Sequence, residues 1–244
     1  MTREIVRSAA RNNAAWCDAV CRAHGRPGVF ADTLWFNHDE TPRFYPDAVT
    51  TEGAQAGAAQ LDALDALIAA DQRRGWAVKD SFAALDLSSR GFRTLFDAQW
   101  IHREPSTVRR EQARDDLHWV RVADAVALHA WELALMGDPA DDHRASPIFV
   151  PRLLASDGVA LFAAERAGEI IGGGALIMAA GVVGASNVFG ALADRTDVWH
   201  GLLDQAERLY PGAAVVGYER GDDLEIACKA GFDPVGPLRV WARG

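Results

Sequence analysis

Residues 224–244 read LEIACKAGFDPVGPLRVWARG, and they repeat a pattern that residues 85–104, LDLSSRGFRTLFDAQWIHRE, have already shown. In both stretches a short segment of helical character runs into Gly-Phe, and an apolar, β-prone run then ends at a tryptophan. Phe92 leads to Trp100 in the first copy, and Phe232 leads to Trp241 in the second. The repeat indicates that one structural unit occurs twice in the chain.

The segments that precede the two copies also correspond. Their periodicity predicts a strand, a helix and a strand, over residues 44–51, 58–74 and 75–82 in the first half and over 182–189, 197–210 and 212–219 in the second. The second half adds a helix over residues 122–136, a short helix after Pro147 and a strand meander over residues 158–189. This order predicts an α+β protein with a mixed sheet.

Charged residues beside Pro105 place the boundary between the halves near residues 105–114, so that residues 1–105 and 106–244 are expected to form two lobes. A first helix is expected over residues 6–25. The irregular segment that follows holds Trp35, Phe36, Phe44 and Tyr45, which either cap the core or line a pocket with Arg43.

Composition limits the classes of partner. The 244 residues are 49% apolar and 24% charged, as in an ordinary globular protein, and the net charge of −9 disfavours DNA. The arginine-rich segment 103–121 is either a solvated linker or a polyanion contact. No run is long and apolar enough for a membrane span or a secretory signal, so a cytoplasmic location without membrane contact is expected.

The three cysteines are Cys17, Cys21 and Cys228. No histidine or cysteine follows them at ligand spacing, so buried, reduced thiols are favoured and no metal site is predicted.

Two segments resemble the GNAT acyltransferase superfamily. LFAAERAGEIIGGGALI, residues 161–177, is similar to its central hairpin, and ACKAGFDPVGPLRVW, residues 227–241, is similar to its last helix and strand. The resemblance covers about residues 117–244. Residues 40–104 match only as a truncated copy, as in tandem GNAT proteins and the related Fem-type aminoacyl transferases.

The resemblance implies a GNAT-like mixed sheet with splayed central strands and two tandem lobes. Strands 182–189 and 212–219 would be the splayed pair, whose unpaired backbone holds the amide-rich arm of an acyl donor. The N-terminus of the helix between them would face the phosphates of the donor. The activity implied is transfer of an acyl group to an amine, with acyl-CoA as a possible co-substrate and no tightly bound cofactor.

The sequence departs from that family at two functional positions. Where the family has a glycine-rich phosphate loop, this chain reads GALADRTDVW, and Asp194 and Asp197 would face a pyrophosphate with like charge. Where the family often has an acidic tyrosine, Ala227 stands beside Cys228, and Leu87 takes that place in the first half.

Candidate site residues follow from position along the expected strands and helices, and each also has a purely structural interpretation. The catalytic candidates are Glu219 as a base at the mouth of the splay, its neighbour Tyr218, and His200. The donor-binding candidates are Ser186, Asn187, Gly190 and Arg195, of which Arg195 is the cation nearest the helix N-terminus. The acceptor-binding candidates are Arg43, Tyr45, Lys79 and Asp80. Gly172, Gly173 and Gly174 indicate close approach by a ligand or a bulge.

Three functions stay open on these residues. An acyl-CoA-dependent transferase would modify the amine of a small molecule. An aminoacyl-tRNA-dependent transferase fits the absent phosphate loop, although the acidic net charge disfavours tRNA. A catalytically inactive binding module fits the loss of both loop and tyrosine.

Overall fold

The computed structural model describes residues 2–70, 75–105, 116–137 and 146–244. The described helices are α1 (Thr2–Ala23), α2 (Gly57–Ala70), α3 (Ala125–Met136), α4 (Arg195–Leu209) and α5 (Gly221–Lys229). The described strands are β1 (Val29–Phe30), β2 (Leu34–Phe36), β3 (Ala48–Thr50), β4 (Trp76–Asp80), β5 (Arg93–Arg103), β6 (His118–Arg121), β7 (Val159–Arg166), β8 (Glu169–Ala179), β9 (Val182–Gly190), β10 (Val215–Glu219) and β11 (Asp233–Arg243). None of these helices is both long and apolar enough to cross a bilayer.

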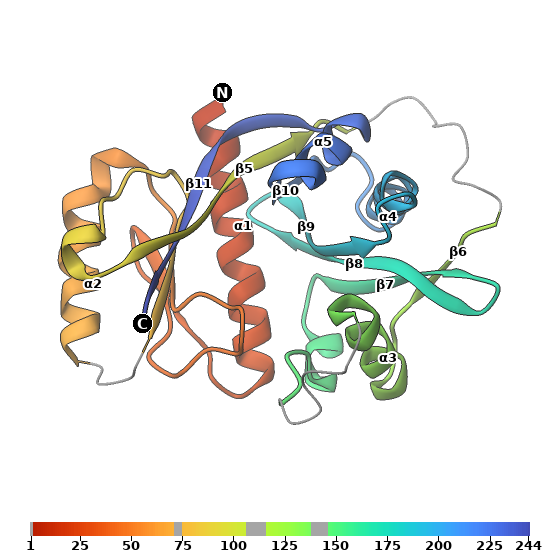
Figure 1. The fold of residues 1–244 in the computed structure, drawn as a ribbon, viewed down its shortest axis with the longest axis horizontal. Coiled ribbons are helices and arrows are strands. Elements are labelled where there is room, and N and C mark those ends of the chain that lie inside the picture. The colour runs from red at the N-terminus through yellow and green to blue at the C-terminus, as the bar shows by residue number, and fades with distance from the viewer. Residues whose placement is uncertain (1, 71–74, 106–115, 138–145) are drawn as a thin grey trace.

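All of these strands belong to one mixed sheet, in the order β1-β2-β3-β4-β11-β5-β10-β9-β8-β7-β6. The predicted α+β class with a mixed sheet is therefore confirmed. The two halves exchange their last strands: β5 of the first half pairs with β10, and β11 of the second half pairs with β4. β5 and β11 also pair with each other along most of their length, so the C-terminus lies among the strands of the first half (Figure 1).

The repeated Gly-Phe forms the same turn in both halves. Gly91 has φ 78° and Gly231 has φ 93°, a left-handed conformation that glycine adopts without the penalty of a Cβ. The N–H of Phe92 donates to the Leu87 carbonyl at 3.2 Å, and the N–H of Phe232 donates to the Ala227 carbonyl at 3.1 Å. The helical segment expected before Gly91 is only a 3₁₀ turn, Ser88–Arg90.

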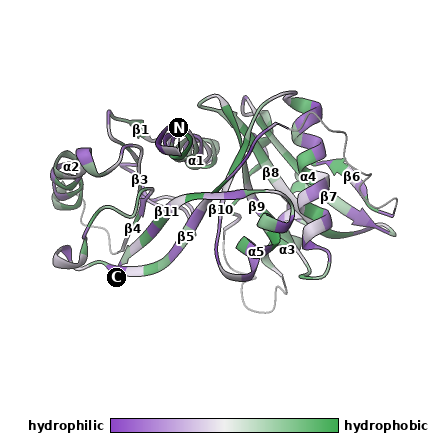
Figure 2. Ribbon diagram, turned by 90° about the horizontal axis from the view of Figure 1, so that it is seen from above, coloured by the Kyte–Doolittle hydropathy of each residue, from purple (hydrophilic) through white to green (hydrophobic). Residues whose placement is uncertain are grey.

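Helix α1 lies across one face of the sheet and joins the two halves (Figures 1 and 2). Toward the first half, its Cys17 and Cys21 pack against Trp35 of β2. Toward the exchanged strands, its Val6 packs against Trp100 of β5 and Leu238 of β11, among other residues. These contacts bury one helix against strands from both ends of the sequence.

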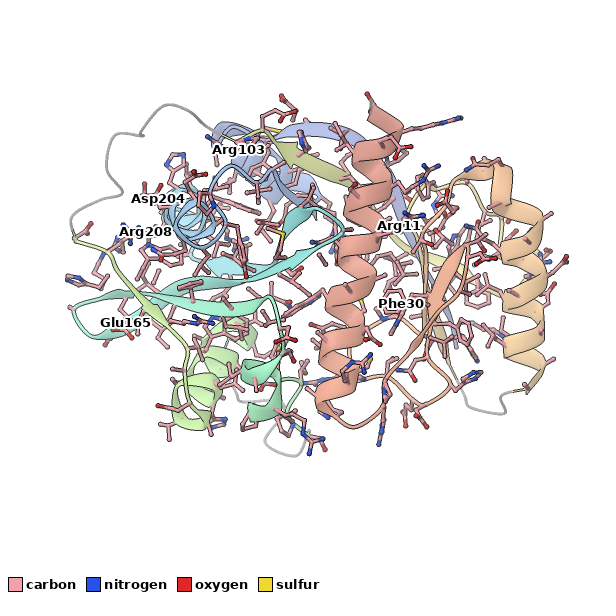
Figure 3. The ribbon with its side chains drawn as sticks, turned by 180° about the vertical axis from the view of Figure 1, so that it is seen from behind. Arg11, Phe30, Arg103, Glu165, Asp204 and Arg208 are labelled. Atoms are coloured by element: carbon pink, nitrogen blue, oxygen red, sulfur yellow. The ribbon has the colours of Figure 1, made fainter. Side chains whose placement is uncertain are left out.

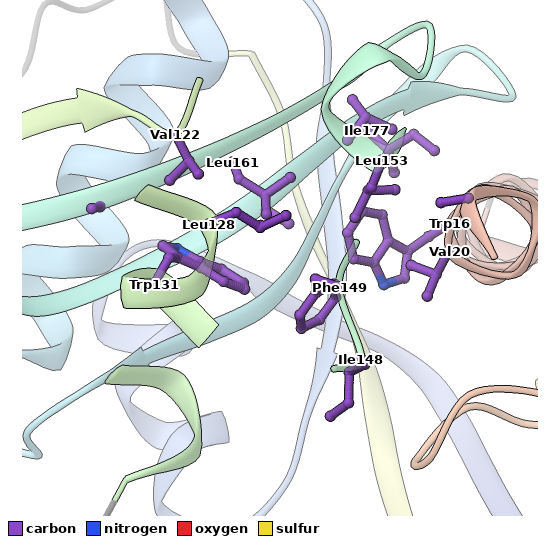
Figure 4. Close-up of a cluster of buried hydrophobic side chains, with 14 of the residues drawn as sticks. Trp16, Val20, Val122, Leu128, Trp131, Ile148, Phe149, Leu153, Leu161 and Ile177 are labelled. Atoms are coloured by element: carbon purple, nitrogen blue, oxygen red, sulfur yellow. The ribbon is translucent and has the colours of Figure 1, made fainter. Parts of the chain in front are cut away.

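The second half buries apolar side chains on both faces of its strands. On the face that carries α1, Trp131 of α3 packs edge-on against Phe149 and Phe189 at 5.3 Å between ring centroids, and Trp16 of α1 joins the same cluster (Figure 4). On the opposite face, α4 and α5 cover β7 to β10, where Trp199 packs against Phe232. α2 covers β2 to β4 in the first half.

The glycines Gly172, Gly173 and Gly174 of β8 make room for the core. A Cβ on Gly173 would lie 2.5 Å from the Phe162 carbonyl oxygen and 2.8 Å from Nε1 of Trp131, which donates to that same oxygen. A Cβ on Gly174 would lie 2.7 Å from Leu202. Close packing explains the absence of side chains here, and β9 carries a bulge opposite this stretch.

Gly173→Ala is therefore expected to destabilise the protein by about 1–3 kcal/mol, because the added methyl group overpacks backbone and a buried indole. Gly57→Ala is the matched control, since its Cβ would meet only Leu85 at 3.7 Å in helical backbone. Urea unfolding of both variants measures the difference. Equal stabilities would contradict the packing explanation.

The structure differs from the sequence-based expectations in four further places. β1 and β2 lie in the segment expected to be irregular, and β6 lies within the segment 103–121, whose residues 106–115 fall outside the described residues. β6 is a four-residue edge strand in which only Trp119 is partly buried, so it lacks the buried apolar pattern of an internal strand. The helix expected after Pro147 is a 3₁₀ turn, Pro151–Ala155, and Cys228 is exposed, whereas Cys17 and Cys21 are buried as predicted.

Candidate active site

The parallel strands β9 and β10 pair only over a short distance. The ladder consists of Val215 opposite Val183 and Val216 opposite Gly184, and the strands form no further pairs beyond these. The predicted splay is therefore present. A cleft of about 230 Å³ lies at this point. Its lining residues are Asn13, Trp16, Cys17, Phe44, Tyr45, Pro46, Lys79, Ala185, Ser186, Asn187, Val188, Tyr218 and Glu219.

The β9 wall of the cleft is bulged. The register of β9 against β8 shifts between Gly173 and Ala175, and Asn187 lies at this bulge with φ 53°. Asparagine tolerates this left-handed conformation better than most residues do. A bulge redirects a side chain, and the amide of Asn187 lines the cleft together with Ser186.

A tyrosine from the first half reaches the bulge. The hydroxyl of Tyr45 donates to Oδ1 of Asn187 at 3.4 Å. Burial raises the pKa of Tyr45 well above its ordinary value, so its hydroxyl stays protonated and can donate. Beside it, Phe44 has φ 70° and is 74% exposed at the rim. Such backbone is strained for a bulky residue, and strain of this kind gathers at ligand-binding segments.

Lys79 enters the cleft from β4. Its ammonium donates to Oδ1 of Asn13 at 2.7 Å and to the hydroxyl of Tyr218 at 3.3 Å, and Nζ lies 4.4 Å from the centroid of the Tyr218 ring. The Tyr218 ring is fixed by an edge-on contact with Trp100. Side chains from α1, β4, β5 and β10 therefore hold one another in place.

Glu219 lines the cleft where β10 ends. Burial raises its pKa to about 8; the nearby Asp223 adds to the rise, and Arg195 opposes it. Glu219 lies toward α4 and α5, whose Arg195 and Asp223 form an ion pair, whereas the preceding residue Tyr218 faces α1. A carboxyl group whose pKa lies near neutrality can both accept and donate a proton.

Two of the predicted donor-binding residues are engaged within the protein. The guanidinium of Arg195 donates to the Gly190 carbonyl and pairs with Asp223. The carboxylate of Asp194 at the start of α4 pairs with Arg166 at 3.0 Å. Asp194, which was expected to repel a pyrophosphate, thus shares Arg166 with a second carboxylate, that of Asp116.

Three further predicted residues also lie outside the lining of the cleft. The Asp80 carboxylate accepts from the backbone N–H of Leu85 and closes the loop after β4. The Arg43 guanidinium lies over the Phe44 ring, above a separate hollow. His200 lies on α4 near Asp204. Figure 3 labels Asp204 together with Arg103 and Arg208, which also act on its carboxyl group. These three are not proposed as site residues.

The sequence-based candidates omit the contribution of α1 to the cleft, which consists of Asn13, Trp16 and Cys17. One signal was present: two adjacent asparagines lie in the interior of the first helix, where asparagine is unfavourable. Both are buried, and Nδ2 of Asn12 donates to three carbonyls at the end of the β8–β9 hairpin.

We compared the chain with known protein families, curated proteins and solved structures. No family model matches the chain, and no curated protein matches its sequence. Among solved structures, it is similar to a GCN5-related N-acetyltransferase from Kribbella flavida, with a TM-score of 0.65 and 18% identity over 96% of this chain and 95% of that one. The chain has the GNAT fold.

The chain is also similar to two further solved structures, of which the first is named as a GNAT protein. A GCN5-related N-acetyltransferase from Sphaerobacter thermophilus has a TM-score of 0.54 at 12% identity, over 97% of this chain and 93% of that one. A conserved protein of unknown function from Staphylococcus epidermidis has a TM-score of 0.55 at 9% identity, over 86% of this chain and 83% of that one. The relation to Fem-type transferases stays a prediction.

Proposed function

We propose that the protein is an acyltransferase that uses an acyl thioester of CoA to acylate the amine of a small molecule. The observation that carries the proposal is the position of Glu219 and Tyr218 in a cleft that opens where β9 and β10 separate. Unpaired backbone at such a separation can bind the amide-rich arm of the donor. The neighbouring GNAT-fold proteins named as N-acetyltransferases support the same class of reaction.

The roles follow from the two faces of β10. Glu219 accepts a proton from the amine, while the amine nitrogen bonds to the acyl carbon and the bond from that carbon to sulfur breaks. The hydroxyl of Tyr218 lines the cleft in which both reactants would meet, and it supplies a proton to the leaving thiolate. It would replace the tyrosine of the family, whose position is occupied by Ala227 in this chain. Asn187 and Ser186 orient the reactants at the bulge, because their side chains line the same cleft.

Two observations support a thioester donor in this proposal. Arg103 donates to the Ala230 carbonyl, and Arg195 is paired within the protein, so neither forms part of an exposed basic track. The segment 103–121 holds further arginines. All of them except Arg121 lie outside the described residues. With a net charge of −9, tRNA binding would need such a track.

The test combines binding and turnover. Calorimetry should detect acetyl-CoA or a longer acyl-CoA, and thiol release should appear when an acceptor amine is added. Salt-sensitive binding of charged tRNA without acyl-CoA binding would replace the thioester by an aminoacyl donor. Absence of both bindings would leave a non-catalytic module as the better account.

A further inference from the structure

Lys79 is a buried cation without a counter-ion. It is 5% exposed, and within the described residues no carboxylate lies within ion-pair distance of its ammonium. Only two of the 25 basic residues are lysines, and the other, Lys229, is exposed on α5. Lysine is rarely buried unless it is paired, because removing an ammonium from water is costly.

The side chains that accept hydrogen bonds from Lys79 do not supply a negative charge. Its two hydrogen-bond partners are the amide of Asn13 and the phenol of Tyr218. Burial raises the pKa of the Cys17 thiol even though Lys79 acts against the rise, so Cys17 stays a neutral thiol. Burial likewise keeps Tyr45 protonated. The neighbouring carboxylate of Asp80 is bound by the amides of its own loop.

The position of Lys79 indicates which reactant would supply the missing charge. Its partner Tyr218 packs on the face of β10 that α1 covers, whereas Glu219 lies toward α4 and α5. Donor phosphates would lie at the N-terminus of α4, on the face opposite to α1. The space beside Lys79 is therefore the acceptor side of the cleft. At about 230 Å³, the whole cleft is smaller than the ~300–1,000 Å³ typical of pockets for drug-sized ligands, so it suits a small acceptor.

We propose that the acceptor is a small amine that carries a carboxylate, as a free amino acid does, and that Lys79 binds this carboxylate. This inference rests on the proposed function in one respect, namely that the bound amine is the acceptor substrate. Binding of a carboxylate at Lys79 does not depend on any turnover. The carboxylate would supply the charge that the protein leaves unpaired, and the amine would extend along the cleft toward Glu219.

The binding test uses the scarcity of lysine. Protein labelled with ¹³C at lysine Cε has only two such sites, Lys79 and Lys229. Leucine and leucinamide, or phenylalanine and phenylalaninamide, are matched probes that differ only in the carboxylate, and each is titrated with and without acyl-CoA. We expect the amino acid to shift the Lys79 signal saturably, while the amide does not and the Lys229 signal stays in place. No shift by any amino acid, or an equal shift by the amide, would overturn the inference.

The kinetic test is the substitution Lys79→Met, with Lys229→Met as the matched control. The ratio of kcat/KM for the amino acid to that for its amide is expected to fall about 10- to 100-fold in Lys79→Met, since a hydrogen-bonded charge pair is lost. The control should keep the ratio of the parent protein. If Lys79 only holds Asn13 and Tyr218 in place, both substrates lose activity equally and the ratio is unchanged, which would overturn the inference.

The two proposals fail in distinguishable ways. Saturable binding of an amino acid at Lys79 without any acyl transfer would support the carboxylate site and reject the transferase. Acyl transfer without a preference for carboxylates would support the transferase and reject the inference. If Lys79→Met does not fold, the titration of the unaltered protein still tests whether Lys79 binds a carboxylate.

Discussion

Glu219→Gln is expected to lower kcat/KM for acyl transfer by about 10²- to 10⁴-fold, the range that a positioned general base contributes. Glutamine keeps the shape of the side chain and cannot accept the proton of the amine. Because the pKa of Glu219 is raised to about 8, kcat/KM of the parent protein should rise with pH up to that region and level off above it. The assay should use an acceptor whose amine has a low pKa. The amine is then unprotonated over the whole pH range, and only the titration of Glu219 changes the rate.

The control for this experiment is Glu225→Gln on the exposed side of α5, which should keep the parent rate and pH profile. Donor binding should persist in Glu219→Gln, which separates chemistry from binding. A pH profile that keeps its rising limb in Glu219→Gln would show that another group is the base.

The raised pKa of Glu219 should also make the free energy of unfolding depend on pH. The folded pKa of Glu219, about 8, exceeds the ordinary value of 4.5, so between these values the folded state holds a proton that the unfolded state has lost. The resulting stabilisation is complete below pH 4.5 and is lost as the pH rises to about 8. Glu219→Gln should therefore gain stability relative to the parent over this window, on the order of 3 kcal/mol after solvent screening. Urea unfolding at pH 5 and pH 8.5 measures the gain.

Removal of residues 233–244 is expected to abolish cooperative folding of both halves. β11 lies between β4 of the first half and β5, and β5 in turn pairs with β10, so the deletion leaves a gap within the sheet. It also removes Trp241 from the first-half core and Leu238 from the contact with α1. Circular dichroism and tryptophan fluorescence should both show loss of the transition.

Point variants test the same contact without a deletion. Leu238→Ala should cost about 2–5 kcal/mol, because the side chain is fully buried between α1 and the exchanged strands. Leu95→Ala on the neighbouring strand β5 is the matched control, since Leu95 is 55% exposed and should change stability by no more than about 0.5 kcal/mol. Two separate unfolding transitions, with only one of them moved by Leu238→Ala, would indicate that the halves fold independently. The division into lobes 1–105 and 106–244 stays a prediction until then.

Local pattern was sufficient for much of the fold. The periodicity of residues 58–74 and 197–210 predicted α2 and α4, and the alternation in the meander predicted β7 to β9. The placement of Glu219 and Tyr218 at the mouth of the splay also followed from sequence, because both lie at the end of an apolar strand. β6 was not predicted, because it is a short edge strand whose side chains are exposed except for the partly buried Trp119.

The roles of Lys79, Asp80 and His200 could not be separated from sequence. Lys79 and Asp80 are neighbours on β4, yet alternation along a strand sends their side chains to different surroundings, one into the cleft and the other to its own loop. His200 follows the core residue Trp199 on α4, and helix geometry turns it toward Asp204. The packing of the helices and strands determines that Lys79 lines the cleft and that Asp80 and His200 do not.

By itself, the sequence showed that a pattern of helical segment, Gly-Phe and apolar run occurs twice, and it placed Glu219 at the end of an apolar strand. These features depend on residues close together in the chain, whose conformational preferences act locally. The tertiary structure alone decided that β5 and β11 change places and that α1 brings Asn13 and Trp16 to a cleft shared with Lys79. The physical reason is that a strand's pattern records which of its faces is buried, whereas its partner is chosen by contacts between distant segments.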